Sequence, residues 1–421
     1  MSAPTILDTA GLAAIIAALA TLTDDVDAQE QIDRIRLLEE LKSAAAAAQV
    51  KLTAAFAEQR RAANLAAGVP DRQAGRGIAG EIGLARRISP HRAQREVGWA
   101  RILVAELPAT LATLAAGGTS EWRALLVARE TAWLSREHRA AVDAELAPRL
   151  GSLGDRQVEA EAKRLGYRLD PAGYVERMRN APNERHVTIR PAPDAMVRLS
   201  ALLPAPQGVA CYASLASAAD TSTAAGDTRG RGQIMADTLI ERLTGQQSAS
   251  QVPVTVNLIL TDQTLLARGD EPALLDGHGP IPAQIARDLA IGSSENAPRW
   301  LRRLYAHPST GQLIAMESRR RLFPKGMRTF IRFRDQNCRT PYCNANIRQT
   351  DHIIQAARGG PTCLECGQGD CETCNYTKET PGWTTRRIDN DDGSHEVETT
   401  TPTGHTYRSR APDPPGARPA A

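Results

Sequence analysis

Six of the seven cysteines in this chain fall between Cys338 and Cys374, near its C-terminal end. They include two local pairs, Cys338 with Cys343 and Cys371 with Cys374. Thiolates in two such pairs are typical of a closed tetrahedral zinc site, whereas the disulfides of secreted domains are spread over the whole framework. The pattern therefore predicts a small module in which a structural Zn²⁺ ion supplies folding energy that a small core lacks.

Two further cysteines, Cys363 and Cys366, lie between these pairs and leave the ligand set open. We favour the two outer pairs as the zinc ligands. A set that includes the two inner cysteines is the alternative.

The length and the charge of the chain limit its possible architectures and partners. At 421 residues it is too long for one ordinary core, which favours two or three domains. Lys and Arg number 51 against 48 acidic residues, a formal charge of +3, so any nucleic-acid surface must be local. The apolar stretch at residues 10–22 is shorter than a membrane span and lacks a basic leader. We therefore expect a cytoplasmic protein that has no membrane partner.

The first 180 residues predict a helical domain. From Asp27 to Ala67, good helix formers are frequent and apolar residues recur at helical spacing, until Gly68 and Pro70 end the pattern. Further helical patterns, separated by glycine or proline, cover residues 92–107, 120–144 and 155–165.

Residues 181–318 predict an α+β continuation of that domain. Strand patterns at 186–190 and 253–260 alternate with a helical pattern at 232–243, and the small, polar residues 218–230 predict a flexible loop. From Trp300 a hairpin-like stretch leads to the cysteine-rich domain, which we place at residues 319–390. Residues 391–421 form a short extension that we expect to be partly disordered, because it is rich in proline after about Arg408.

Asp351 and His352 stand side by side between the cysteine pairs, ahead of a turn that contains Gly359 and Gly360. A carboxylate and an imidazole can together hold a divalent ion and activate a water molecule. Neighbours in an ideal strand point to opposite faces, so a shared site requires a strand end or a bulge. Alone, the dipeptide is more typical of a half-exposed pair in a hairpin.

The second cysteine pair adds a helix face to this arrangement. Cys371, Cys374, Asn375 and Lys378 follow the i, i+3, i+4, i+7 spacing of one face of a helix. Such a helix directs two zinc thiolates, an amide oxygen and a cation towards the Asp351–His352 strand.

Together, these motifs resemble the HNH endonuclease motif. The residues that carry the resemblance are Cys338-x4-Cys343, Asp351-His352, Gly359-Gly360-Pro361-Thr362, Cys371-x2-Cys374-Asn375 and Pro381-Gly382-Trp383. More specifically, the chain resembles the actinobacterial family in which a long helical domain of unknown function precedes an HNH nuclease, and the similarity includes residues 232–237 and 319–323. It implies a mainly α fold with an α+β middle region, followed by a zinc-stapled ββα-metal (HNH) nuclease module at residues 319–390.

The resemblance also implies roles for individual residues. His352 is the expected general base, which takes a proton from the attacking water. Asp351 and Asn375 are the expected ligands of one catalytic divalent ion, Mg²⁺ or Mn²⁺, which stabilises charge on the scissile phosphate and the leaving oxygen. The central Asn of the family is replaced here by Cys366, which bears on how firmly His352 is held, because a thiol lacks the donors and the acceptor of an amide.

A run of cations leads into the cysteine block and predicts contacts with DNA phosphates. Together with Lys378, the predicted contacts are Arg319, Arg320, Arg321, Lys325 and Arg328. A solvated helix face is the alternative. Phosphate contacts position DNA without reading its sequence, so no target sequence follows.

Our leading hypothesis is a metal-dependent endonuclease that hydrolyses DNA phosphodiester bonds. One alternative is a zinc-containing DNA-binding protein whose nuclease activity is weakened or lost because Cys366 replaces the Asn of the family. Another is an interaction protein built on the helical domain. The sequence indicates neither the oligomeric state nor the role of the helical domain.

Overall fold

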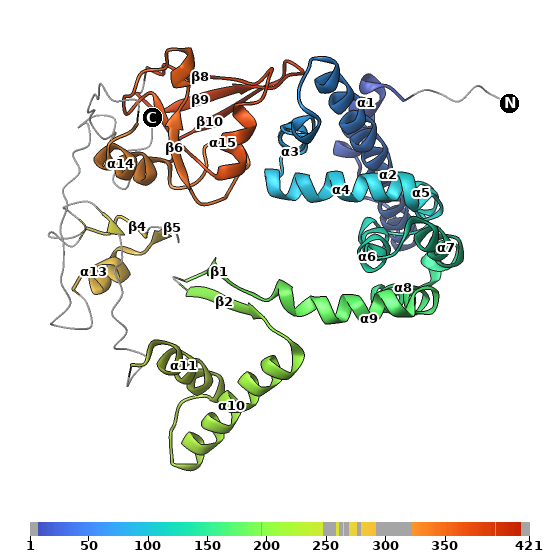
Figure 1. Ribbon diagram of the computed structural model, residues 1–421, viewed down its shortest axis with the longest axis horizontal. Coiled ribbons are helices and arrows are strands. Elements are labelled where there is room, and N and C mark those ends of the chain that lie inside the picture. The colour runs from blue at the N-terminus through green and yellow to red at the C-terminus, as the bar shows by residue number, and fades with distance from the viewer. Residues whose placement is uncertain are drawn as a thin grey trace. The chain divides into compact units, whose positions relative to one another are not determined.

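The computed structural model describes residues 7–194, 196–246, 258–260, 264, 269–275, 279–291, 322–391 and 393–413. Most of the described elements are helices, and the strands form small antiparallel sheets (Figure 1). The chain divides into two compact units, Met1–Phe56 with Val97–Tyr174, and Ala57–Glu96 with Val175–Ala421. The fold is mainly helical with an α+β middle, as the sequence predicts, and its C-terminal region is rich in β-strands.

The first unit is a bundle of helices. Its elements are α1 (Thr9–Ala20), α2 (Ala28–Ala66) as far as Phe56, α4 (Pro90–Glu106) from Val97 onwards, α5 (Pro108–Ala115), α6 (Glu121–Thr131), α7 (Arg136–Leu146), η2 (Ala147–Ser152) and α8 (Asp155–Leu169). Apolar side chains from these helices form one core, which includes Val50, Leu103, Leu107, Leu111, Leu114, Val127, Val142, Leu146, Leu150, Val158 and Leu165.

Local capping explains where several of these helices begin and end. The Asp27 carboxylate accepts a hydrogen bond from the Glu30 amide at 2.9 Å, so α2 begins where the sequence predicts. The helix expected over residues 120–144 is divided into α6 and α7, because Ser135 caps a new helix and accepts from the His138 amide. Among the described helices, none is by itself long and apolar enough to cross a membrane; α4 and α5 pass that test only as a pair bent by 105°.

The second unit begins at Ala57 with the end of α2, includes α3 (Ile78–Arg86) and the start of α4, and resumes at Val175 within α9. Its middle part contains α9 (Pro171–Asn180), a hairpin of β1 (His186–Ala192) and β2 (Met196–Leu202), α10 (Ala205–Ala224), α11 (Arg231–Thr244), a sheet of β3 (Leu258–Ile259), β4 (Ala273–Leu275) and β5 (Gly279–Ile281), and α13 (Ala283–Ile291). Short 3-10 turns η1 (Asp71–Gln73) and η3 (Ala181–Glu184) precede α3 and β1.

Two expectations for this middle part need comment. The predicted loop at residues 218–230 is wrong in its first half, because α10 continues through this alanine-rich stretch to Ala224 and the connection to α11 is short. The predicted strand at 253–260 falls mostly outside the described residues, and so does the hairpin-like stretch from Trp300. Arg319, Arg320 and Arg321 also lie outside them.

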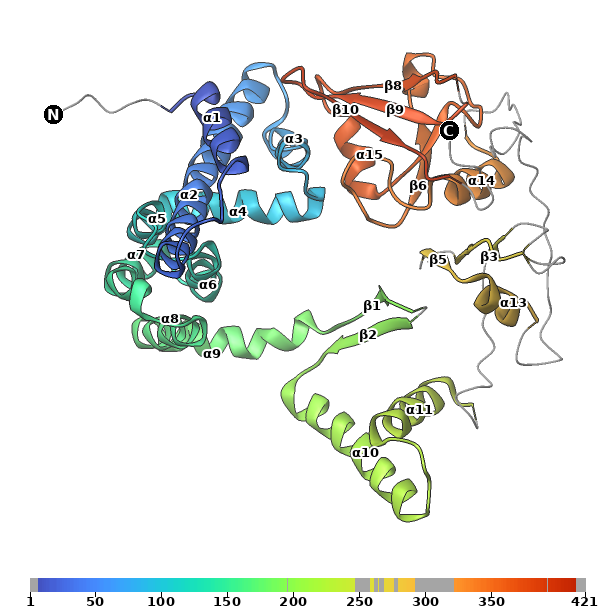
Figure 2. The ribbon, with the colours of Figure 1, turned by 180° about the vertical axis from the view of Figure 1, so that it is seen from behind.

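Residues 322–413 form what we call the C-terminal module. It comprises α14 (Lys325–Asp335), a hairpin of β6 (Gln349–His352) and β7 (Gly367–Asp370) with η5 (Ala356–Arg358) between them, α15 (Glu372–Lys378), and a sheet of β8 (Thr384–Ile388), β9 (Glu396–Thr400) and β10 (Thr406–Arg410). Figures 1 and 2 both show α15 beside the β8–β10 sheet.

The described part of the C-terminal extension contains two strands, β9 and β10, which the sequence did not predict. Both strands belong to the β8–β10 sheet, with β9 in the middle. Glu398 on β9 pairs with Arg386 on β8 at 2.7 Å and with Arg408 on β10 at 3.1 Å. Cross-strand pairing of opposite charges stabilises a sheet, so the module continues at least to Arg410. Residues 414–421 lie outside the described part.

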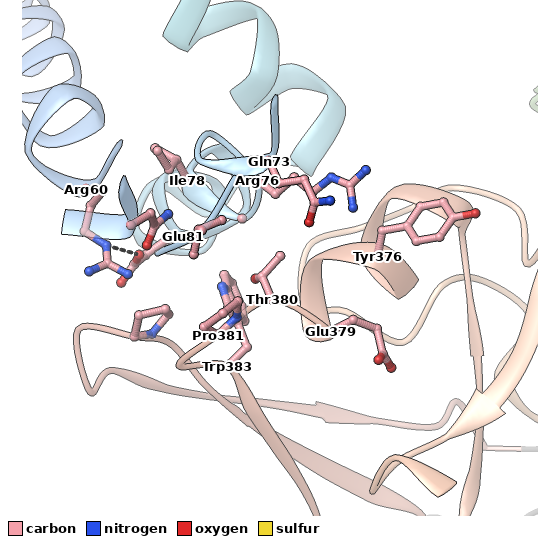
Figure 3. Close-up of a pocket in the computed structure, with 14 residues that line it drawn as sticks. Arg60, Gln73, Arg76, Ile78, Glu81, Tyr376, Glu379, Thr380, Pro381 and Trp383 are labelled. Atoms are coloured by element: carbon pink, nitrogen blue, oxygen red, sulfur yellow. Dashed lines mark ion pairs between the residues drawn. The ribbon is translucent and has the colours of Figure 1, made fainter. Parts of the chain in front are cut away.

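Within the second unit, α3 packs on the C-terminal module at Trp383 (Figure 3). Gly77 has a φ of +82°, and a Cβ added there would lie 2.8 Å from Trp383 Nε1. A Cβ on Gly80 would lie 3.0 Å from Thr377 Cγ2. The buried Glu81 carboxylate accepts a hydrogen bond from the Thr403 amide at 3.0 Å. We call this contact the α3 docking contact.

The docking contact predicts unequal effects of two glycine substitutions. Gly68 and Gly77 both have left-handed backbone angles, but no atom lies within 4 Å of a Cβ added at Gly68. Gly68→Ala should therefore cost about 1 kcal/mol of unfolding free energy, from the backbone alone. Gly77→Ala should cost at least about 1 kcal/mol more, because it also overpacks the contact with Trp383. Urea unfolding of both variants measures the difference, and equal losses would contradict the docking contact.

Candidate metal centre and Asp-His site

Four cysteine side chains meet at the base of the C-terminal module. The Sγ atoms of Cys338, Cys343, Cys371 and Cys374 all lie within 4.8 Å of one another. Cys343 is half-buried and the other three are buried. This grouping fits a structural Zn²⁺ site and brings together the two outer pairs that the sequence favours as ligands.

Local structure on both sides brings the two pairs together. The Cys338 amide donates to the Ala345 carbonyl at 2.9 Å, which closes the turn that carries the first pair. Cys371 is the N-cap of α15, and its Sγ accepts from the Cys374 amide at 3.5 Å. Hydrogen bonds among the four thiols, that of Cys338 first, lower the pKa of Cys371, while the same network raises the pKa of Cys374. A thiolate is the form that binds a metal ion.

The two inner cysteines are joined to each other. Cys363 and Cys366 form a disulfide in the loop between β6 and β7, with their Cα atoms 5.0 Å apart. The alternative zinc set is therefore wrong, because these sulfur atoms are already bonded. The Cys366 carbonyl also accepts from the Ile353 amide at 2.8 Å, next to His352. At the position where the resembled family has an Asn, this loop is closed by a disulfide and a backbone hydrogen bond.

A buried polar cluster beneath this loop anchors it to α14. The Arg334 guanidinium donates to the carbonyls of Leu364 and Gly367, both at 2.7 Å. The Asp335 carboxylate, almost fully buried, accepts from the Gly369 amide at 2.7 Å. The sequence suggested that the cations of this run face solvent or phosphates. Arg334 instead satisfies buried carbonyls, which no local spacing could have indicated.

His395, which directly precedes β9, also belongs to this buried cluster. Its Nε2 lies 3.1 Å from the Glu365 carbonyl oxygen, and its ring is 6% exposed. Burial, followed by the positive charge of Arg334, lowers the pKa of His395 to about 3. The imidazole is therefore neutral in the folded protein at ordinary pH.

Asp351 and His352 are the last two residues of β6, so they lie at a strand end as a shared site requires. The His352 ring is buried, its Nε2 lies 2.8 Å from Thr362 Oγ1, and its centroid lies 4.6 Å from that of Phe323. The Asp351 carboxylate bends back towards its neighbour: Oδ1 accepts from the His352 amide at 2.8 Å and lies 3.6 Å from Nδ1. The carboxylate and the imidazole therefore face each other.

Lys378 on α15 lies between two carboxylates. Its Nζ is 3.0 Å from Asp351 Oδ2, 2.8 Å from Asp370 Oδ2 and 3.1 Å from the His352 carbonyl oxygen. Burial would raise the pKa of Asp351, but the Lys378 ammonium outweighs it and lowers that pKa. Because Lys378 is buried and paired, its position does not favour the predicted contact with nucleic acid.

Asn375 on α15 is the third residue predicted for the divalent-ion site. Its amide nitrogen donates to Gln349 Oε1 on β6. Its Oδ1 is buried and has no hydrogen-bond partner among the described residues. A buried polar atom without a partner costs free energy, so such an atom often marks the place of a water or an ion.

The remaining predicted nucleic-acid residues that are described, Lys325 and Arg328, lie exposed on α14. Their placement is compatible with either a phosphate contact or a solvated face, the two alternatives that the sequence left open.

The chain was compared with known protein families. A family described as "Domain of unknown function (DUF222)" matches residues 35–335. The match ends at Asp335, the last residue of α14, so the four-cysteine cluster and the Asp-His pair lie beyond it. No curated protein and no solved structure matches the chain. No named relative found by these comparisons therefore supports the HNH resemblance of the C-terminal module.

The metal centre predicts a clear difference between the outer and the inner cysteines. The purified protein should contain about one tightly bound zinc, and Cys338→Ser or Cys374→Ser should remove it together with the fold of the module. The double variant Cys363→Ser and Cys366→Ser is the matched control and should keep its zinc. Elemental analysis decides this, and a zinc-free wild type would overturn the metal centre.

His395 predicts a loss of stability in mild acid. Its folded pKa of about 3 lies below its usual value of 6.5, so its contribution is fully present above pH 6.5 and is lost as the pH falls towards 3. The loss should approach 1.4 kcal/mol per pH unit below 6.5. Urea unfolding between pH 7.5 and 5 should show a shallower decline for His395→Gln, and parallel curves would refute this role. Acid release of zinc affects both proteins alike, so the difference isolates the imidazole.

Proposed function

We propose a nuclease function for this chain. The chain belongs to the DUF222 family, because the model of that family covers residues 35–335 of its 421 residues. The proposed reaction is metal-dependent hydrolysis of DNA phosphodiester bonds in the cytoplasm, by an HNH-type C-terminal module. One observation carries the proposal. Asp351, His352 and the unpartnered Asn375 Oδ1 belong to one strand-loop-strand-helix unit above a four-cysteine cluster.

Asp351 and Asn375 are the proposed ligands of a catalytic Mg²⁺ or Mn²⁺ ion. A carboxylate and an amide oxygen are the hard donors that such ions prefer, and the orphaned Oδ1 of Asn375 fits this use. Asp351 is a half-buried carboxylate whose lowered pKa keeps it charged. When bound, the ion would supply positive charge next to the scissile phosphate.

His352 is the proposed general base. In the tautomer whose Nε2–H donates to Thr362 Oγ1, the lone pair of the ring is on Nδ1, which faces the Asp351 carboxylate. Nδ1 would accept a proton from the attacking water, and Asp351 would stabilise the resulting imidazolium. Phe323 packs on the ring and limits its rotation.

The loop that carries Thr362 is a positioning element in this proposal. The Cys363–Cys366 disulfide and the Arg334 hydrogen bonds hold its backbone, so Thr362 keeps its place beside the imidazole. Lys378 similarly holds Asp351 Oδ2 and leaves Oδ1 turned towards His352. Lys325 and Arg328 on α14, with Arg319, Arg320 and Arg321 ahead of them, would contact DNA phosphates.

Plasmid cleavage tests this function. With Mg²⁺ or Mn²⁺, the wild type should nick or cut plasmid DNA, and His352→Ala should reduce the rate by roughly 100- to 10,000-fold, the usual range for a general base. Asp351→Ala should be at least as damaging, because it removes a charged ligand. His186→Ala, a change of an exposed histidine on β1, is the matched control and should leave the rate unchanged. Equal activity of all four proteins would point to a contaminating nuclease and refute the proposal.

A second candidate is a zinc-containing DNA-binding protein that does not cut. Two observations favour it. Lys378 already pairs with the Asp351 carboxylate that would bind the catalytic ion, and the His352 ring that would act as the base is buried. A wild type that binds DNA with salt dependence but leaves plasmid intact with either ion would select this function.

A further inference from the structure

The α3 docking contact joins a basic segment of the DUF222 domain to the C-terminal module. Residues 57–96 contain eight arginines against four carboxylates, although the whole chain is nearly neutral. The segment packs closely against the C-terminal module, since a Cβ added at Gly77 would lie against Trp383 and a Cβ added at Gly80 would lie against Thr377. Its excess of positive charge is therefore held next to α15, the helix that carries Asn375.

Half of these arginines are already engaged with carboxylates of the same segment. Arg60 pairs with Glu81, Arg61 with Asp71, and both Arg86 and Arg92 with Glu96. The others are exposed and have no carboxylate partner among the described residues; they are Arg72, Arg76, Arg87 and Arg95. They account for the local surplus of charge.

Arg76 is the member of this surplus that lines a pocket next to α15. It lines one pocket together with Gln73, Tyr376 and Glu379, and Figure 3 shows its guanidinium on the same side of the pocket as the Tyr376 ring. Tyr376 directly follows Asn375. The cavity holds only about 100 Å³, room for a few waters but well below the size of pockets that enclose a nucleotide. A ligand of Arg76 must therefore extend over the surface.

We propose that Arg72 and Arg76 bind backbone phosphates of the nucleic acid whose scissile phosphate occupies the Asp351–Asn375 site. This inference rests on the proposed function and gives the DUF222 domain a substrate-binding role within it. The guanidinium group suits phosphate because it donates two parallel hydrogen bonds to an anion. An extended polyanion matches the exposed arginines of residues 71–95, because these are the cations without a described carboxylate partner in the segment that packs beside α15. Besides Glu81, which is paired with Arg60, Glu379 is the one carboxylate that lines this pocket.

Salt-dependent binding of duplex DNA tests this role. The full-length protein is used without an added divalent ion, so that DNA is bound but not cut. The double variant Arg72→Gln and Arg76→Gln should lower the slope of log affinity against log salt by about two units. A roughly fourfold rise in salt would then weaken the wild type about ten times more than the variant. Unchanged zinc content and melting temperature show that the variant is folded.

Two controls separate charge from position. Arg72→Lys with Arg76→Lys should keep the wild-type slope, because each phosphate contact remains cationic. Arg177→Gln with Arg179→Gln removes two equally exposed arginines of α9 and should also leave the slope unchanged. An equal loss in the α9 variant would mean that only net charge matters and would overturn the inference.

The outcomes also separate this inference from the proposed function. A wild type that cuts DNA, with a slope that the Arg72 and Arg76 substitutions do not alter, overturns the phosphate contact and leaves the nuclease standing. A wild type that neither binds nor cuts DNA refutes both. If the double variant instead loses binding to an acidic peptide while its DNA slope is unchanged, the surface serves a protein partner and the inference fails.

Discussion

The Lys378 ammonium, buried between Asp351 and Asp370, joins α15 to both strands of the β6–β7 hairpin. Its two carboxylate partners lie on adjacent strands, and it also donates a hydrogen bond to the His352 carbonyl oxygen at 3.1 Å. Removing one member of such a buried set leaves an uncompensated charge, at a cost of about 3–5 kcal/mol. The angle of the helix against the hairpin is thereby fixed, and with it the distance between Asn375 and the Asp-His pair. The four cysteines secure the same helix from its other end.

Features encoded by neighbouring residues were predictable. The spacing of the cysteine pairs identified the four clustered thiols, since each pair is closed by its own turn or helix cap. The position of Asp351 and His352 at a strand end followed from requiring both side chains to face one site. The start of α2 followed from its capping Asp27. In each case the decisive interaction spans only a few residues, so periodicity and capping are sufficient to indicate it.

Interactions between distant segments were not predictable. The helical spacing directed Lys378 towards the Asp351–His352 strand, but it indicated neither the burial of this lysine nor its ion pair with Asp351, 27 positions earlier. Glu81 and Thr403 are separated by 322 positions. The ordered β9 and β10 strands were hidden by a polar, proline-containing sequence whose stability comes from pairing with β8. Strand order depends on neighbours in space, so composition alone underestimated this part of the module.

The division of the chain into units has a consequence for how such proteins can be recombined. Residues 57–96 belong with the C-terminal module, although they are encoded between segments of the helical bundle. A gene fusion that transfers only residues 319–413 would expose the face of Trp383 that Gly77 and Gly80 now cover, and would leave Glu81 behind in the donor. A functional chimera must therefore inherit two non-contiguous stretches. The C-terminal module and residues 57–96 are thus constrained to be exchanged between relatives together.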